Sequence, residues 1–255
     1  MTERKGILPS MRLDGMTALV TGAGRGIGRG CAQALAEAGA EVICVSRTRS
    51  ELEELVADIE ALGGKARAET CDVSEPGQIE ALFEGLERLD VLVNNAGMST
   101  VHPVTEIPVE NLDRMLNVNC RGMVLVAKGA ARIMERQQSG VMINLSSTYG
   151  KVGRATNSVY AATKHFVEGF TKSIALELAP KGVRVCAIGP TAIETPMTTD
   201  RLNDPVYGPD LLSRIPMGRF GQVQDVVGAV VFLASPAAAL ITGTTIMVDG
   251  GWTAQ

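Results

Sequence analysis

The sequence has little of what marks several classes of protein. It contains two histidines, and its five cysteines are scattered without a C-x-x-C pair, so the common ligand sets for a metal site are missing. No cluster of Lys and Arg is present and the formal net charge is -4, which argues against nucleic acid or an anionic membrane as a partner. The longest apolar run, 226–234, is far short of the ~20 residues that span a bilayer.

Also missing is the apolar h-region of a secretory signal peptide after the opening M-T-E-R-K-G. Together with the scattered cysteines, this predicts free thiols in a reducing cytoplasm. The 255 residues are 45% hydrophobic and 20% charged, a globular composition with room for one large core. With no internal repeat or low-complexity tract, we expect a single domain over residues 1–255.

Short apolar strands alternate with amphipathic helices along the chain. This alternation predicts a doubly wound α/β (Rossmann) domain, in which helices cover both faces of a mainly parallel sheet. The predicted strands are 17–20, 41–45, 66–70, 90–93, 141–143, 183–188 and 244–248. The predicted helices are one that follows the glycines at 22–28 and stops at Gly39, then 49–62, 75–88, 109–137, 158–179 and 222–234. Segment 190–216 holds five of the eleven prolines, and we expect it to cover the substrate.

The first predicted strand runs straight into the glycine-rich turn T-G-A-G-R-G-I-G at 21–28. A strand, a glycine turn and a helix in this order expose backbone N–H groups at the helix N-terminus, where a pyrophosphate binds well. The spacing is G-x-x-x-G-x-G rather than the commoner G-x-G-x-x-G. A plain turn is the alternative, and the flanking strand and helix favour the dinucleotide site.

The second predicted strand is followed by Ser46, Arg47 and Thr48, about 20 residues past the glycines. In a dinucleotide-binding fold this position contacts the adenosine ribose, and an acidic residue there would bind a free 2′-hydroxyl. Arg47 instead suits a 2′-phosphate, because a guanidinium binds phosphate through two N–H groups. The pattern therefore predicts NADP(H), unless Arg47 is simply a solvated surface residue.

Polar residues also follow the third and fourth predicted strands. Asp72 and Asn95 fall at strand C-terminal ends, where open α/β sheets bind ligands, although two adjacent asparagines can also form a turn. In the helix predicted at 109–137, Leu112, Leu116, Asn119, Met123 and Val126 form a stripe that should face the core. Asn119 is the polar misfit in this stripe. It is either a hydrogen-bonded core residue or part of the site, where it would order a water.

Residues 143–164 carry the acid–base chemistry, in the stretch I-N-L-S-S-T-Y-G-K-V-G-R-A-T-N-S-V-Y-A-A-T-K. Tyr160 and Lys164 are four residues apart in a predicted helix and therefore share a face, although such a pair can arise by chance. An ammonium beside a phenol favours the phenolate, so we expect Lys164 to lower the pKa of Tyr160 from its reference near ~10. Ser147, at the end of the preceding strand, would hold the oxygen that the tyrosine protonates.

With these pieces in place, the chain resembles the short-chain dehydrogenase/reductase family over about residues 13–252. The motifs that carry the resemblance are T-G-x-x-x-G-x-G at 21–28, N-N-A-G at 94–97, the asparagine at 119, the serine at 147 and Y-x-x-x-K at 160–164. The resemblance implies a seven-stranded sheet and a catalytic tetrad of Asn119, Ser147, Tyr160 and Lys164. It also implies homotetramers that pair through the helices at 109–137 and 158–179.

Residues in the motifs and at the strand ends are expected to bind the dinucleotide. They are Gly22, Arg25, Gly26, Ile27, Arg47, Thr48, Asp72, Val73, Asn95, Tyr160, Lys164, Ile193 and Thr195. Of these, Ile193 and Thr195 are implied by the resemblance, because the family holds the nicotinamide carboxamide through the stretch written here as 190–195. Two departures are P-T for the usual P-G at 190–191 and C-A-I-G-P for the usual N-x-x-x-P at 186–190. No metal ligand is expected.

Three substrate groups within the family stay open. P-T at 190–191, V-S-R-T at 45–48 and R-I-P-M-G-R-F at 214–220 are most similar to NADPH-dependent L-xylulose/dicarbonyl reductases. G-R-x-T at 153–156 is similar to gluconate 5-dehydrogenases, and the general frame to 3-oxoacyl-carrier-protein reductases. Lys151 and Arg154 could dock an acidic carrier, whereas Thr148, Asn157 and Thr191 would place short polar groups around the carbonyl. The latter favour a small polar ketone, ketose or dicarbonyl.

A different class of function, a dinucleotide-sensing protein without turnover, would also use this fold. Such relatives typically lack the tyrosine or the lysine, and this chain has both.

Overall fold

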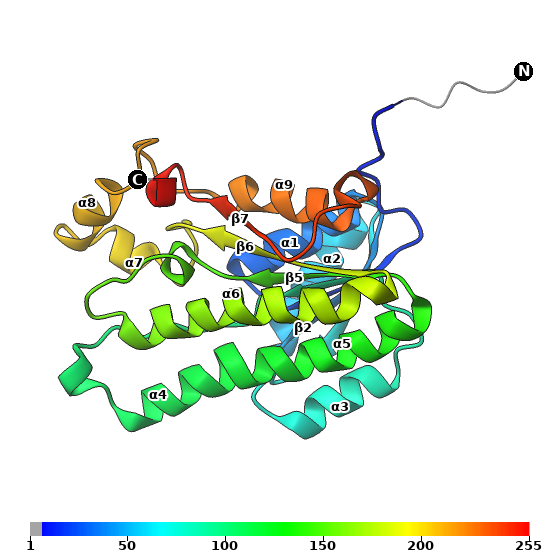
Figure 1. Ribbon diagram of the computed structural model, residues 1–255, viewed down its shortest axis with the longest axis horizontal. Helices are drawn as coiled ribbons and strands as arrows, with labels where there is room; N and C mark the ends of the chain where they lie inside the picture. Colours follow the sequence, from blue (N-terminus) through cyan, green and yellow to red (C-terminus); the bar gives the residue numbers. More distant parts are fainter. Residues whose placement is uncertain (1–6, 255) are drawn as a thin grey trace, which may run out of the picture.

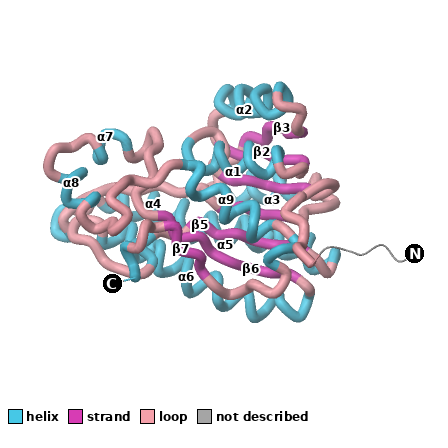
Figure 2. The backbone as a smooth tube through the Cα atoms, turned by 90° about the horizontal axis from the view of Figure 1, so that it is seen from above, coloured by secondary structure: helices cyan, strands magenta, loops and turns pink. Residues whose placement is uncertain are grey.

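The computed structural model describes residues 7–254, so the first six residues, on which the expectation about a signal peptide bears, lie outside it together with residue 255. The chain forms a seven-stranded sheet in the order β3-β2-β1-β4-β5-β6-β7, and every neighbouring pair is parallel. Helices lie on both sides of the sheet (Figures 1 and 2). This confirms the predicted doubly wound α/β class. No helix within 7–254 meets the length and apolarity needed to cross a membrane.

The elements agree with the predicted ones to within a few residues at most ends. The strands are β1 Thr17–Thr21, β2 Glu41–Ser46, β3 Lys65–Thr70, β4 Val91–Asn94, β5 Gly140–Leu145, β6 Val183–Pro190 and β7 Thr245–Val248. The longer helices are α1 Gly26–Glu37, α2 Arg49–Ala61, α3 Pro76–Glu84, α4 Val109–Leu116, α5 Met123–Gln137, α6 Ser158–Leu178 and α9 Val223–Ala234. Two short helices, α7 Thr199–Leu202 and α8 Tyr207–Leu212, lie in the predicted covering segment.

Each face of the sheet has its own core. On one face, α1, α2 and α9 pack through residues such as Leu35, Leu55 and Val230. On the other, α3, α5 and α6 pack through Ile79, Ile133 and other apolar side chains. Strands covered on both faces must be apolar on both, which is why β1, β2 and β4 consist largely of Val, Leu, Ile and Ala. Because all neighbouring strands are parallel, their carboxyl ends lie at the same edge of the sheet, and polar loops can gather there.

The helix predicted at 109–137 is divided by a π-helical turn, Asn117–Gly122, between α4 and α5. A π-turn holds one more residue than an α-turn, so it changes the phase of the buried stripe. Met115 is buried with 1% exposure, whereas Leu116 is 41% exposed. The predicted stripe is therefore wrong at Leu116, where Met115 takes the buried position, whereas Leu112 is partly buried. Asn119, Met123 and Val126 are buried as expected.

Candidate functional site

A cleft of about 320 Å³ opens at the carboxyl ends of the strands. The strand order reverses between β1 and β4, and such a reversal point is where open α/β sheets bind ligands. Thirteen sequence-predicted site residues and Ser147 line this cleft: Gly22, Arg25, Gly26, Ile27, Arg47, Thr48, Asp72, Val73, Asn95, Tyr160, Lys164, Ile193 and Thr195. Segments as far apart in sequence as Gly22 and Thr195 therefore meet in this cleft, whereas Asn119 does not line it.

The glycine-rich turn presents the N-terminus of α1 to the cleft. Its N-cap residue, Arg25, gives no side-chain cap, and no acidic residue lies in the first turn, so the first N–H groups of α1 remain available to an anion. A Cβ at Gly28 would lie 2.2 Å from the carbonyl oxygen of Gly22, so only glycine fits there. Gly26 has φ of 58°, a left-handed conformation that favours glycine. These features fit the phosphates of a dinucleotide.

Arg47 lies at the end of β2 with its side chain 64% exposed. It forms a long ion pair with Asp72, whose Oδ2 is 3.9 Å from Nη1, a distance at which the guanidinium remains free to bind a further anion. The other oxygen of Asp72 accepts from the backbone N and the hydroxyl of Ser74, at 2.9 and 2.8 Å. The geometry is compatible with a 2′-phosphate at Arg47. Glu51, which the sequence reasoning missed, also lines this end of the cleft.

The adjacent asparagines at the end of β4 are not a simple turn. Asn94 is buried and its Nδ2 donates to the carbonyl of Met123, 2.9 Å away, at the start of α5. Asn95 donates to the carbonyl of Thr21, 2.9 Å away, and its backbone N donates to the Thr21 hydroxyl. The pair therefore fixes the glycine-rich turn against β4 and α5.

Ser147, Tyr160 and Lys164 reach the cleft from β5 and α6. Ser147 follows β5 directly, and its Oγ accepts from the backbone N of Tyr149 at 3.2 Å. The Nζ of Lys164, a residue only 5% exposed, donates to the carbonyl of Leu145 at 2.7 Å and lies 5.6 Å from the centroid of the Tyr160 ring. The i,i+4 spacing in α6 places both side chains on one face, as the sequence predicts.

The pKa of Tyr160 differs from the expectation. Burial raises it to about 12, and the Ser147 hydroxyl and the charge of Arg201 only partly offset that rise. Burial also lowers the pKa of Lys164 to about 8. Lys164 was expected to lower the tyrosine pKa, but its ammonium is directed to the Leu145 carbonyl and desolvation is the larger effect. At neutral pH the phenol therefore holds its proton.

Asn119 lies outside the cleft, in the π-helical turn, with 1% exposure. Its Oδ1 accepts from the backbone N of Met98, and its Nδ2 donates to the carbonyl of Met98, both at 2.8 Å. Nδ2 also donates to the hydroxyl of Thr163, which in turn donates to the carbonyl of Tyr160. Met98 lines the cleft. The Asn119 amide thus connects the wall of the cleft with α6, the helix that carries Tyr160. That Asn119 orders a water in the site remains a prediction.

Of the three short polar residues expected around the carbonyl, only Thr191 lines the cleft. Its Oγ1 is buried and has no hydrogen-bond partner among the described residues. Thr148 and Asn157 are buried elsewhere, with 1% and 2% exposure. Thr148 is the first residue of the short 3-10 helix η3, Thr148–Gly150, and Asn157 is the N-cap residue of α6.

The two cations considered for carrier docking are both paired within the protein. Lys151 Nζ lies 2.5 Å from Oε2 of Glu168, and Arg154 Nη2 lies 2.8 Å from Oδ2 of Asp210. Glu168 is a buried carboxylate that the sequence reasoning missed, and it also accepts from the hydroxyls of Ser146 and Thr245. A charged residue four positions after Lys164 in the same predicted helix could have indicated that Glu168 lies near the site. These pairings weaken the case for a docking surface.

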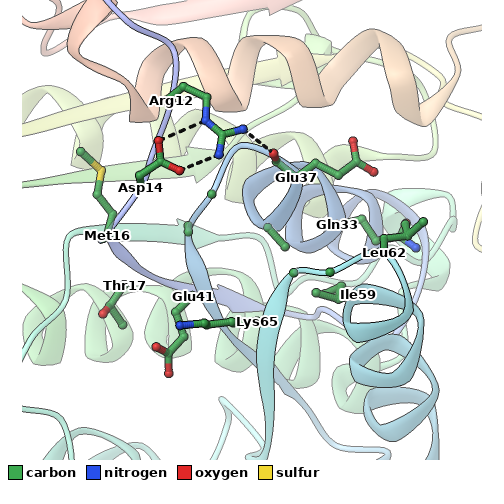
Figure 3. A pocket seen from close by; sticks show the side chains of 16 residues that line it. Arg12, Asp14, Met16, Thr17, Gln33, Glu37, Glu41, Ile59, Leu62 and Lys65 are labelled. Atoms are coloured by element: carbon green, nitrogen blue, oxygen red, sulfur yellow. Dashed lines mark hydrogen bonds and ion pairs between the residues drawn. The ribbon is translucent and has the colours of Figure 1, made fainter.

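A second hollow, of about 390 Å³, lies at the opposite edge of the sheet (Figure 3). Thr17, Glu41 and Lys65, the first residues of β1, β2 and β3, line it. Its arginine, Arg12, is engaged by Asp14 and by the carbonyl of Glu37, as the dashed lines show. The hollow contains none of the predicted site residues. No group of three or more His, Cys, Asp or Glu side chains suited to a metal occurs within 7–254.

Known proteins similar to this chain match it over nearly its whole length. The family model described as enoyl-(acyl carrier protein) reductase matches residues 22–253. The L-xylulose reductase of Bos taurus is 39% identical over 96% of this chain and 99% of its own. A 3-oxoacyl-[acyl-carrier-protein] reductase of Thermotoga maritima is 38% identical over 94% and 99%. A gluconate 5-dehydrogenase of Burkholderia cenocepacia J2315, solved with NADP and tartrate, has a TM-score of 0.93 and 35% identity over 96% and 98%.

Proposed function

Because the chain belongs to the short-chain dehydrogenase/reductase family, we propose that it transfers a hydride between NADP(H) and the carbonyl or secondary alcohol of a small polar substrate. The observation that carries the proposal is a single cleft that joins an uncapped helix N-terminus at the glycine-rich turn with Ser147, Tyr160 and Lys164. A dinucleotide-sensing protein without turnover would need only the first of these.

The dinucleotide would lie along the carboxyl ends of the strands. Its phosphates would bind the N-terminus of α1 and its 2′-phosphate would bind Arg47. Asp72, Val73 and Asn95 would flank the adenosine half, with Ile193 and Thr195 beside the nicotinamide. The neighbouring gluconate 5-dehydrogenase was crystallised with NADP, which supports the choice of NADP(H). When bound, the cofactor supplies the hydride.

In the proposed reaction the protein's own residues bind the substrate oxygen and transfer a proton to it. Ser147 would donate a hydrogen bond to the substrate oxygen, and Tyr160 would protonate the alkoxide that forms there. The raised tyrosine pKa suits this direction, since the phenol is protonated at neutral pH and holds the proton to be given. The Lys164 ammonium would stabilise the resulting phenolate, and Asn119 would keep a water in the relay through the backbone that it holds.

The substrate is proposed to be a small polar ketone, ketose or dicarbonyl. Thr191 places a short polar side chain at the cleft, and Lys151 is already paired with Glu168, which favours a short polar substrate over a carrier-bound acyl chain. A site whose polar groups bind substrate hydroxyls rejects analogues without them. The reductases of L-xylulose among the relatives support the same choice.

The test is steady-state oxidation of NADPH with a panel of matched carbonyl compounds. We expect pentuloses and vicinal diketones such as diacetyl to be reduced with higher kcat/KM than a 3-oxoacyl thioester. Preference for the thioester would shift the choice to an acyl-carrier-protein reductase. Reduction of no carbonyl compound, with tight NADPH binding retained, would favour the dinucleotide-sensing alternative.

We also propose that the chain folds as a single domain and assembles into a homotetramer. Its proposed location is the cytoplasm, a reducing compartment. Large apolar side chains are exposed on the helices that the family pairs: Val109 and Leu116 on α4, and Phe166 and Leu176 on α6, the last with 80% exposure. All five cysteines are free thiols, which suits a reducing compartment. Light scattering at several protein concentrations tests the assembly, and a stable monomer would contradict it.

A further inference from the structure

A pocket of about 490 Å³ lies near Tyr160, and some of its lining residues pack in the same cluster as this tyrosine. It lies between the loop that follows β5 and the covering segment, and Val152, Arg154, Tyr207, Asp210, Arg214 and Trp252 are among the residues that line it. One ring separates it from Tyr160. Tyr149 packs edge-on against Tyr160, with ring centroids 6.1 Å apart, and against Trp252 at 5.8 Å.

The pocket carries an excess of one positive charge. Among the described residues that line it, three are charged, and the carboxylate of Asp210 is shared by two guanidinium groups. Arg154 binds one oxygen of Asp210 at 2.8 Å and Arg214 binds the other at 3.1 Å. The charged side chains that line the pocket therefore attract an anion.

Arg154 is also short of one hydrogen-bond partner. Its side chain is only 12% exposed, and its Nη1 is buried without a partner among the described residues. The guanidinium is held in place by the ring of Tyr207, whose centroid is 4.5 Å from Cζ. A buried donor without an acceptor is costly, and the planar fork of arginine matches a carboxylate through two N–H groups. Asp210 accepts from Nη2 of Arg154, and no described residue accepts from Nη1.

We propose that this pocket binds a carboxylate substituent of the substrate, so that Arg154, with Arg214, makes the enzyme prefer anionic ketones to neutral ketones of the same size. The proposal rests on the proposed function and names the substrate class more narrowly. A substrate with its carbonyl at Ser147 and Tyr160 would extend past Tyr149, and its carboxylate would compete with Asp210 for the two arginines. Asp210 thus occupies part of the anion's place in the resting structure.

Two substrates that differ only at the charged group test the preference. 5-Keto-D-gluconate has a carboxylate where L-sorbose has a hydroxymethyl group, and diacetyl serves as a small neutral reference. We expect kcat/KM for the acid to exceed that for L-sorbose by about 10-fold or more, as for a hydrogen bond to a charged group. Arg154→Met should bring the ratio close to one while diacetyl reduction is kept. Arg219→Met is the control, because Arg219 pairs with Asp225 outside the pocket.

A binding measurement separates this proposal from the proposed function. Trp252 lines the pocket and is the chain's only tryptophan, so its fluorescence reports occupancy without turnover. With NADP⁺ present, D-gluconate should change the emission at concentrations where neutral D-sorbitol does not, and Arg154→Met should abolish the difference. Asp210→Asn should strengthen the gluconate response, since it removes the competing carboxylate. This variant also serves if Arg154→Met fails to fold.

The outcomes are distinguishable. If diacetyl and both sugars fail as substrates but gluconate still binds selectively, the proposed function falls and the anion pocket stands. If diacetyl is reduced but the acid and L-sorbose are reduced equally, the anion pocket falls. An Asp210→Asn variant with an unchanged or weaker gluconate response also overturns it, because the aspartate would then be only a structural partner of the arginines.

Discussion

Replacing Glu168 by glutamine should destabilise the protein because this buried carboxylate joins four elements. Glu168, on α6, accepts from Ser146 after β5, from Lys151 after η3 and from Thr245 on β7, each at 2.5 Å. Glutamine keeps the shape, but one oxygen becomes an NH₂ group that faces donors. Hydrogen bonds to a charged group contribute about 1.5–3 kcal/mol each, and the bond from Lys151, whose side chain is 34% exposed, contributes less. We expect Glu168→Gln to lower the free energy of unfolding by about 2–3 kcal/mol.

The contribution of Glu168 to the free energy of unfolding should depend on pH. The hydrogen bonds from Lys151, Ser146 and Thr245 hold the pKa of Glu168 below its usual value of 4.5, although burial acts in the opposite direction. A carboxyl with a lowered folded-state pKa stabilises the protein above its unfolded pKa, and the contribution is lost as the pH falls through the folded value. The gap between the wild type and Glu168→Gln should therefore be full at pH 7 and should close below about pH 4.5.

Denaturant unfolding at a fixed protomer concentration measures both effects. Glu53→Gln is the control, because Glu53 pairs with Arg49 on the exposed face of α2, where both side chains are more than half exposed. That change should alter the free energy by no more than about 0.5 kcal/mol. The reasoning is refuted if Glu168→Gln costs no more than the control at pH 7, or if its cost is the same at pH 7 and pH 4.

Three further predictions concern the site and its surroundings. Tyr160→Phe should lower kcat for ketone reduction by about 10²–10⁴-fold with NADPH affinity nearly unchanged, and activity within a few-fold of wild type would contradict the assigned role. NADPH should exceed NADH in kcat/KM, and Arg47→Ala should raise KM for NADPH alone; a wild-type preference for NADH would show that Arg47 does not bind the 2′-phosphate. Thr156 has φ of 64°, strained for a β-branched residue, so Thr156→Gly should raise Tm by ~2–4 °C, and an unchanged or lower Tm would argue against that strain.

Local patterns in the sequence determined the frame of the protein. The alternation of apolar strands and amphipathic helices gave the doubly wound class, since hydrophobic periodicity follows directly from backbone geometry. The glycine-rich turn, Arg47 and the Tyr160–Lys164 pair were also found locally, because each depends on residues a few positions apart. Parallel strands bring their carboxyl ends to one edge, so the meeting of these motifs in one cleft followed from the topology.

Tertiary structure decided what depends on contacts between distant segments. The π-helical turn moved the buried position from Leu116 to Met115, a phase change that helical spacing cannot reveal. The pKa of Tyr160 was decided by desolvation, which requires knowing what surrounds the phenol, and sequence proximity to Lys164 indicated the wrong direction. Arg154 and Asp210 are 56 residues apart, and only the packing of α8 against the loop after β5 joins them and leaves Nη1 without a partner among residues 7–254. Charge balance and hydrogen-bond satisfaction are properties of that packing, so the sequence could name these residues but not assign their partners.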